Sequence, residues 1–161
     1  MNKREMTVRI QDILFETMMD GEGLRTSIYV SGCKHKCPHC HNPQTHDFNS
    51  GEEYTIDELM EIIKSEEPYD VTISGGDIMF QPDICYELVK RIENETNLKV
   101  WIYTGFTLQE CLDDPKKRRI LPHIEALVDG RYIHELRTDQ KPFVGSLNQN
   151  VWYIKDLNIS E

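Results

Sequence analysis

Three cysteines lie close together in this 161-residue chain, where Cys33, Cys37 and Cys40 form the spacing C-x3-C-x2-C. This spacing lets one loop wrap a compact metal cluster, and Gly32 just before it permits a close backbone approach. Three thiolates are one fewer than the four that usually hold a 4Fe–4S cluster. The spacing therefore indicates a cluster with one iron open to a substrate or cofactor, just as catalytic zinc sites keep one position free.

Zinc is the alternative metal for the same loop. The three cysteines could complete a tetrahedron with one of His39, His41 or His46. Zinc folds usually bring two separated ligand pairs together, however, and no second C-x2-C follows downstream. The spacing favours iron–sulfur, and it leaves a non-enzymatic zinc-binding interaction module as an alternative.

The other two cysteines belong to apolar helical faces. Cys85 precedes Leu88 and Ile92 on one expected face, and Cys111 follows Leu108 by about one turn. A buried free cysteine behaves as a small hydrophobe. We expect both side chains in the core, with a redox role for Cys111 left open.

Strands alternate with helices along the chain. Runs of β-branched and aromatic residues predict the strands, and apolar residues at i, i+3, i+4 and i+7 predict the helices. Thr55 and Glu58 form a capping-box pattern that opens the first helix. The expected strands are residues 26–30, 71–73, 99–103, 126–128 and 151–154, and the expected helices begin at Ile56, at Pro82 and at about Thr107.

This alternation predicts an α/β fold with parallel strands and right-handed crossovers. A full eight-stranded barrel needs about 200 residues or more, so this chain is too short for one. We expect a partial, laterally open (β/α) barrel with its active site at the carboxyl ends of the strands. No repeat, low-complexity segment or linker divides the sequence, which predicts a single domain over residues 1–161.

The acidic composition argues against a nucleic-acid partner. The formal net charge is -10, and only residues 116–119 are strongly basic, whereas phosphate binding requires a basic face. We interpret this basic run as the solvated end of a helix. No segment approaches the roughly 20 apolar residues of a membrane span, and residues 1–5 lead into no signal-peptide-like run. We expect a cytoplasmic protein, in which five cysteines are thiols or metal ligands.

Segments around the cysteines resemble the radical S-adenosylmethionine activases, which install a glycyl radical on a partner enzyme. They are residues 20–26 (DGEGLRT), running into 31–33 (SGC), and residues 40–45 (CHNPQT). Later segments resemble, more narrowly, the branch whose partner is an anaerobic ribonucleoside-triphosphate reductase. These are residues 74–77 (SGGD), 101–106 (WIYTGF), 128–132 (VDGRY) and 145–149 (GSLNQ). They follow the family's order and span nearly the whole chain. The expected fold is therefore the partial barrel of the radical S-adenosylmethionine type.

A few positions depart from the family's pattern. Ile78 and Met79 stand where proline and leucine are usual. His46, Arg131 and Val144 stand where tryptophan, proline and arginine are common. None of these positions is a cysteine, and together they indicate a divergent member.

The resemblance implies that the three cysteines hold a 4Fe–4S cluster and that S-adenosylmethionine chelates its open iron. Gly75 and Gly76 follow a strand, so the backbone there can approach a ligand without Cβ obstruction. Asp77 can hold the ligand's ammonium group by a charge-assisted hydrogen bond. A plain turn is the alternative for residues 75–77, because Gly-Gly and Gly-Asp pairs mark turns.

Further cofactor contacts are implied near the last cysteine and at a strand end. His39, Cys40 and His41 lie where the family's loop meets the adenine end of the cofactor, with plain surface histidines as the alternative. Thr104 and the glycine after it end a strand on the expected rim, where a simple turn is the competing interpretation. Arg25 precedes the first expected strand and could meet a carboxylate, the partner or a surface ion pair.

The implied reaction is a radical transfer to a protein. A low-potential donor such as flavodoxin or ferredoxin reduces the cluster, S-adenosylmethionine is cleaved, and a Cα hydrogen is removed from one glycine of the reductase. No side chain of this chain need act as a general acid or base, because the cofactors carry the hard chemistry. The alternatives are an activase for another glycyl-radical enzyme and a small-molecule radical S-adenosylmethionine enzyme. Formate-lyase activases are longer, so the short chain and Asn148-Gln149 favour the reductase.

Overall fold

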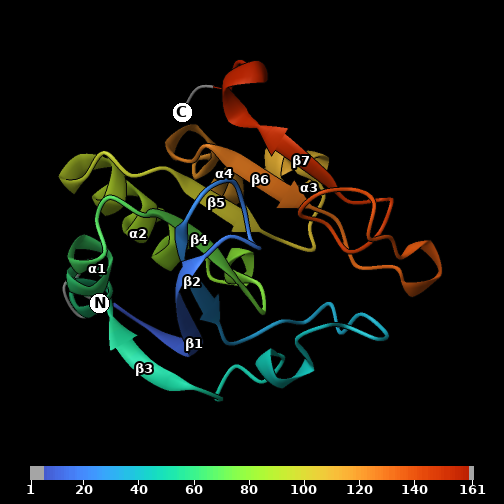
Figure 1. Cartoon of the computed structure of the whole chain (residues 1–161), viewed down its shortest axis with the longest axis horizontal. Coiled ribbons are helices and arrows are strands. Elements are labelled where there is room, and N and C mark those ends of the chain that lie inside the picture. Colours follow the sequence, from blue (N-terminus) through green and yellow to red (C-terminus); the bar gives the residue numbers. More distant parts are fainter. Residues whose placement is uncertain (1–5, 160–161) are drawn as a thin grey trace.

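The computed structural model describes residues 6–159, so the N-terminal residues 1–5 on which the signal-peptide expectation partly rests lie outside it. Its centre is one seven-stranded sheet in the order β3-β1-β2-β4-β5-β6-β7 (Figure 1). The sheet is not closed into a barrel. The strands are β1 (Thr7–Thr17), β2 (Arg25–Val30), β3 (Glu52–Thr55), β4 (Asp70–Gly75), β5 (Val100–Tyr103), β6 (Ala126–Asp129) and β7 (Asn150–Tyr153).

The four middle strands β2, β4, β5 and β6 are parallel, which confirms the expectation for this part of the sheet. The outer strands are antiparallel to their neighbours: β1 pairs with β2 and β3, and β7 pairs with β6. The expectation of parallel pairing is therefore wrong for β7. Only a short 3-10 turn, and no α-helix, lies between β6 and β7, whereas a parallel connection usually needs a helical crossover.

Helices connect the parallel strands. They are α1 (Ile56–Ser65), α2 (Pro82–Glu95), α3 (Leu108–Asp113) and α4 (Pro115–Arg118), with short 3-10 turns at Pro43–Thr45, Ile78–Phe80, Leu121–His123, His134–Leu136 and Ile154–Asp156. The predicted capping box is present: the Thr55 hydroxyl accepts from the Glu58 N–H, and the Glu58 carboxylate accepts from the Thr55 N–H. Among residues 6–159 no helix is long and apolar enough to cross a bilayer.

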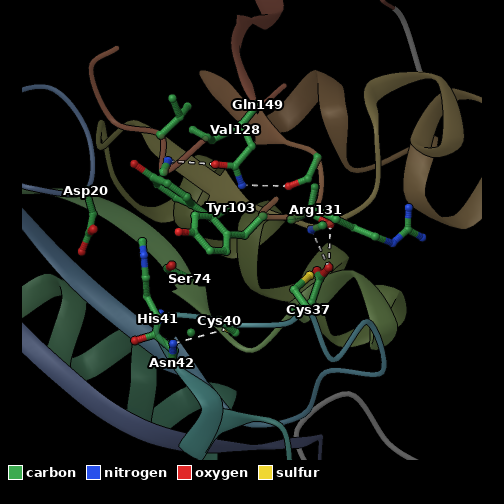
Figure 2. Close-up of a pocket in the computed structure, with 18 of the residues that line it drawn as sticks. Asp20, Cys37, Cys40, His41, Asn42, Ser74, Tyr103, Val128, Arg131 and Gln149 are labelled. Carbon is green, nitrogen blue, oxygen red and sulfur yellow. Dashed lines mark hydrogen bonds between the residues drawn. The ribbon is translucent and has the colours of Figure 1, made fainter. Parts of the chain in front are cut away.

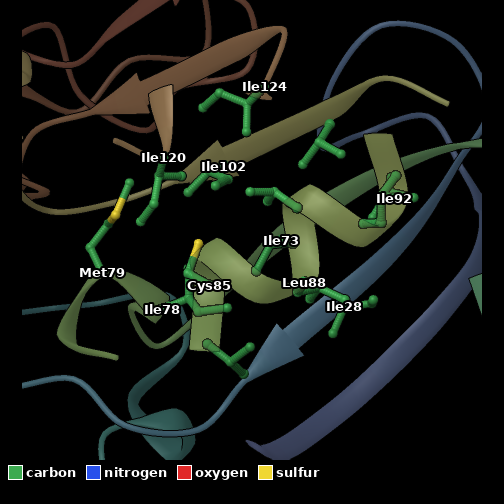
Figure 3. Close-up of a cluster of buried hydrophobic side chains, with 14 of the residues drawn as sticks. Ile28, Ile73, Ile78, Met79, Cys85, Leu88, Ile92, Ile102, Ile120 and Ile124 are labelled. Atoms are coloured by element: carbon green, nitrogen blue, oxygen red, sulfur yellow. The ribbon is translucent and has the colours of Figure 1, made fainter. Parts of the chain in front are cut away.

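Alternate residues of the parallel strands face opposite sides of the sheet. One row packs against the helices, where it meets buried residues such as Leu88 and Ile92 of α2 (Figure 3). Its members are Ile28, Ile73, Ile102 and Leu127, which are paired in register. The other face carries Trp101 and Tyr103, and Trp101 packs in a second, smaller cluster with Ala126 and Val128.

Cys85 and Cys111 are fully buried in the main core, as predicted. Burial raises the pKa of the Cys85 thiol far above its ordinary value and that of Cys111 to about 12. Both side chains therefore stay protonated and pack as apolar groups.

Candidate functional site

A cavity of about 610 Å³ opens at the carboxyl ends of the parallel strands (Figure 2). Its floor is the sheet row that faces away from the helices: Tyr29 and Ser74 are register neighbours, as are Tyr103 and Val128. Its walls come from the loops that follow β2, β4, β5 and β6. The location matches the expectation for an α/β sheet, since ligands bind where these loops meet.

The cysteine loop forms one wall of the cavity. Cys33, Cys37 and Cys40 are free, half-buried thiols that all line it. Backbone bonds hold the loop's ends: the Cys33 N–H donates to the His46 carbonyl at 3.1 Å, and the Cys40 N–H donates to the Cys37 carbonyl at 3.1 Å. The Cys40 sulfur accepts from the Asn42 N–H at 3.4 Å. The three cysteines of the C-x3-C-x2-C motif thus lie on one wall of the cavity.

Partial burial changes the pKa of two of these thiols. It raises the pKa of Cys33 above its usual value, and hydrogen bonds from the backbone of His35 and Lys36 oppose that rise. It raises the pKa of Cys37 as well, against a hydrogen bond from the Tyr132 backbone. Metal binding requires the thiolate forms, so these backbone donors favour the form that a metal needs.

The donor set fits an iron–sulfur cluster. Thiolates are the usual ligands of such clusters, and three cysteine side chains here line one cavity.

Gly75 and Gly76 are required by the chain's own packing. Gly75 has φ +98°, and a Cβ there would come within 2.6 Å of the Val30 nitrogen. A Cβ on Gly76 would come within 2.6 Å of the Gly32 carbonyl oxygen. The Asp77 N–H donates to that same carbonyl at 2.8 Å. The two glycines let the end of β4 lie directly against the start of the cysteine loop, and both also line the cavity.

The Asp77 carboxylate is bound by its own chain. It is 1% exposed, and its Oδ1 accepts from the Met79 N–H at 3.0 Å. Its Oδ2 accepts from the Thr104 hydroxyl at 2.8 Å and from the Gly105 N–H at 2.9 Å, and lies 2.8 Å from His35 Nε2. Asp77 and Thr104, predicted separately as cofactor contacts, are thus partners of each other.

The two predicted histidines differ in position. His41 lines the cavity, with its ring centroid 4.6 Å from that of Tyr132. His39 has a left-handed backbone (φ +60°), is not among the residues that line the cavity, and stacks on His134 at 4.2 Å. Its assignment to the cofactor stays a prediction.

Arg25 is not a surface residue, and its guanidinium forms no ion pair with any side chain of residues 6–159. Its side chain is 1% exposed and lies over the Trp101 ring at 5.3 Å. It donates to the Thr72 hydroxyl at 2.7 Å and to the Val71 carbonyl at 2.9 Å. Its guanidinium therefore satisfies polar groups at the amino-terminal end of the strands, away from the cavity.

Several residues that line the cavity were not predicted from the sequence. Gln149 ties the cavity's far wall together, because its Oε1 accepts from the Gly145 and Ser146 N–H groups and its Nε2 donates to the Gly130 carbonyl (Figure 2). Tyr29 and Tyr103 could have been found from strand alternation, since each lies beside a helix-facing isoleucine. No pattern in the sequence around His35 marked it as a residue of the cavity.

Comparison with known proteins agrees with this geometry. The family of 4Fe–4S single cluster domains matches residues 19–152, so the chain is an iron–sulfur protein with a single-cluster domain. The anaerobic ribonucleoside-triphosphate reductase-activating protein of Vibrio cholerae is 36% identical over 140 residues, covering 82% of this chain and 89% of its own. That of Pasteurella multocida is 33% identical, covering 84% and 90%. The chain belongs to this family of activating proteins.

A more distant similarity is confined to about half of the chain. The pyruvate formate-lyase-activating enzyme of Clostridium pasteurianum is 35% identical over 88 residues, 51% of this chain and 37% of that enzyme. Membership of the activase family makes the chain a radical S-adenosylmethionine oxidoreductase, whose cofactors are a 4Fe–4S cluster and S-adenosylmethionine.

Proposed function

We propose that this protein generates a glycyl radical on an anaerobic ribonucleoside-triphosphate reductase by reductive cleavage of S-adenosylmethionine. The observation that carries the proposal is the loop of Cys33, Cys37 and Cys40, which lines a cavity at the carboxyl ends of four parallel strands. Relatives with the reductase-activating name, similar over most of their length, support the choice of partner.

The open sheet supports a radical S-adenosylmethionine barrel type. Four parallel strands with helices on one face form the partial (β/α) barrel, and the antiparallel strands β1, β3 and β7 extend it at both edges. One sheet includes strands from Thr7 to Tyr153, which supports a single domain over residues 1–161. A laterally open sheet suits a reaction on a peptide segment of a large partner, because the segment must reach the cavity.

Each part of the cavity has a proposed task. The three cysteines hold the cluster, and the backbone at Gly75 and Gly76 lies along the methionine end of S-adenosylmethionine. His41 and, less directly, His39 and Cys40 form the adenine end. Asp77 and Thr104 act together, because their mutual hydrogen bond fixes the ends of β4 and β5. No residue is assigned as a general acid or base.

When bound at the three cysteines, the cluster would supply the electron for reductive cleavage of S-adenosylmethionine. The chain's own residues position the reactants and exclude water. We expect the electron from a low-potential donor such as flavodoxin or ferredoxin, and we place the activity in the cytoplasm, where thiols stay reduced.

The test is anaerobic reconstitution with iron and sulfide, followed by reduction and an assay for 5′-deoxyadenosine. We expect brown protein and product from the wild type, and neither from the Cys33→Ala, Cys37→Ala, Cys40→Ala triple variant. Cys85→Ala, outside the loop, is the matched control and keeps both. Adding the reductase should then give a glycyl radical signal in electron paramagnetic resonance. A colourless protein that holds zinc and cleaves nothing would overturn the proposal.

The second candidate is activation of another glycyl-radical enzyme. The similarity to the formate-lyase-activating enzyme favours it, although only over half of this chain. Offering the reductase and a formate lyase in parallel separates the two, because the radical signal appears only on the true partner.

A further inference from the structure

His35 lies inside the cysteine loop, between Cys33 and Cys37, yet its side chain points away from solvent and is 5% exposed. Its ring is enclosed by aromatic walls, with centroids 4.8 Å from Phe80 and 4.6 Å from Phe106. A Cβ on Gly105 would come within 2.5 Å of the ring, so a glycine is needed at that position. A loop residue with exposed neighbours on both sides is thus packed into the domain.

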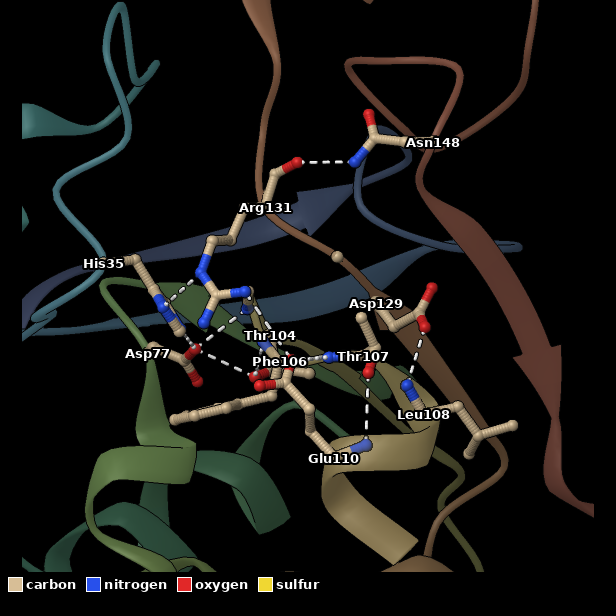
Figure 4. Close-up of polar contacts among 12 residues, drawn as sticks. His35, Asp77, Thr104, Phe106, Thr107, Leu108, Glu110, Asp129, Arg131 and Asn148 are labelled. Carbon is tan, nitrogen blue, oxygen red and sulfur yellow. Dashed lines mark hydrogen bonds and ion pairs between the residues drawn. The ribbon is translucent and has the colours of Figure 1, made fainter.

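Both ring nitrogens of His35 form hydrogen bonds (Figure 4). Arg131 Nε lies 3.1 Å from Nδ1, and a guanidinium can only donate. Nδ1 is therefore the acceptor, and the proton is on Nε2, which donates to Asp77 Oδ2 at 2.8 Å. The ring bridges a buried carboxylate on one side and a half-exposed cation on the other.

The contacts of Asp77 extend this bridge to three strand ends. The residue follows β4, it accepts from Thr104 and Gly105 after β5, and through His35 it reaches Arg131 after β6. The cysteine loop is thus joined to the strand ends through the histidine that lies between two of its cysteines.

We propose that His35 is a positioning residue that anchors the cysteine loop to the ends of β4, β5 and β6 through Asp77 and Arg131, and so determines how firmly the three cysteines hold their cluster. Groups that orient metal ligands typically change metal affinity or activity by about 10–100-fold. The inference rests on the proposed function only in taking the three cysteines as the cluster's ligands, and it is independent of the partner.

Two substitutions separate packing from hydrogen bonding. His35→Phe keeps an aromatic ring between Phe80 and Phe106 but loses both polar contacts. His35→Gln loses the ring but keeps one donor and one acceptor. Lys34→Ala is the matched control, since Lys34 is the exposed neighbour in the same loop.

The first measurement is hydrogen exchange of the apoprotein, and the second is iron loss from the reconstituted protein to a chelator. We expect His35→Phe to speed exchange in the segment around the three cysteines, without a matching change in the sheet, and to lose iron about 10-fold faster. His35→Gln should recover much of both, and Lys34→Ala should match the wild type.

His35→Phe behaving as the wild type in both measurements would overturn the inference. A uniform rise in exchange across the sheet would do the same, because it would mark a general loss of stability. If His35→Phe does not fold, Arg131→Gln tests the same contact from an exposed position, where the expected change is smaller and in the same direction. Neither hydrogen exchange nor iron loss depends on S-adenosylmethionine cleavage. A failure of this inference can therefore be told apart from a failure of the proposed function.

Discussion

At the scale of single residues, the site depends on close backbone contacts that leave no room for side chains. Gly76 is the clearest case, because its α-carbon faces the Gly32 and Thr45 carbonyl oxygens, which a Cβ would approach within 2.6 and 2.9 Å. These oxygens belong to the backbone on either side of the cysteine loop, and the Thr45 oxygen already accepts from the Gly32 N–H at 2.6 Å. Neither can move without disturbing the loop.

We predict that Gly76→Ala lowers the free energy of unfolding of the apoprotein by about 1–3 kcal/mol, the usual cost of overpacking. The measurement is urea unfolding. Gly145→Ala is the control, because its Cβ would meet side-chain rings of His41 and Tyr132 at 3.2 Å, which can rotate away. Equal losses in the two variants would contradict this explanation.

The five cysteines divide into two reactivity classes. Cys33, Cys37 and Cys40 are half-buried at the cavity, whereas Cys85 and Cys111 are fully buried, and the rise in pKa is large for these two. Since the thiolate is the reactive form, we predict that a disulfide reagent at pH 8 modifies three thiols of the folded apoprotein and the other two only after denaturant is added. Five fast thiols in the folded apoprotein would contradict the core assignment.

The same burial makes stability depend on pH at the alkaline side. In the unfolded chain a thiol loses its proton around its ordinary pKa of 9.0, whereas the folded chain keeps the protons of Cys85 and Cys111. Below that pH both states hold the protons and nothing changes. Above it, the free energy of unfolding falls by about 1.4 kcal/mol per pH unit for each buried thiol. Urea unfolding between pH 8.5 and 10 measures this decline, and Cys85→Ala should remove one thiol's share of it.

The sequence singled out Cys33, Cys37 and Cys40 because their spacing is a local pattern, and the three side chains line one cavity. It did not predict His35, because its partners Asp77 and Arg131 lie 42 and 96 positions away. Arg25 was misjudged for a similar reason. The sequence around Arg25 predicts an exposed charge, but the fold buries its side chain against Trp101 and the Val71 carbonyl, which are distant in the sequence.

At the scale of elements, short sequence patterns predicted those features that depend only on residues close together in the chain. The capping box at the start of α1 is an example, since Thr55 and Glu58 satisfy each other's backbone N–H groups at 3.0 Å. We predict that Thr55→Ala destabilises the protein by about 1 kcal/mol, as loss of a helix cap usually does. Thr55→Ser retains the hydroxyl and should keep most of the stability. Urea unfolding of both variants checks this, and an equal loss for serine would contradict it.

Strand pairing was harder to predict than strand position. The four parallel strands were placed nearly correctly, because each is a short apolar run between turn residues. The strand β1 was missed although Val8 and Ile10 alternate and are buried. The strand β3 is short and begins with two exposed glutamates, and it pairs with β1 so that Thr55 lies opposite Thr7. Such long-range pairing leaves no signal within β3 itself.

At the scale of the whole molecule, the main hydrophobic core and the cysteine loop are separate. The main core contains residues of the sheet and the helices, from Val8 to Ile154, and none of its buried members lies between Val30 and Ile56. The cysteine loop is held instead by backbone hydrogen bonds and by the contacts of His35. The main core thus contains no buried residue of the cysteine loop, unlike small zinc domains, whose folding depends on the bound metal.

We predict that the protein stays folded when iron and sulfide are removed under reducing conditions. The far-ultraviolet circular dichroism should keep its shape, and the urea m-value should stay within about 15% of that of the loaded protein, because m follows the surface exposed on unfolding. The midpoint should fall, since bound cofactor stabilises the folded state by mass action. An apoprotein without a cooperative transition would mean that the cluster forms part of the folding core, and it would contradict the separation seen here between the sheet and the cysteine loop.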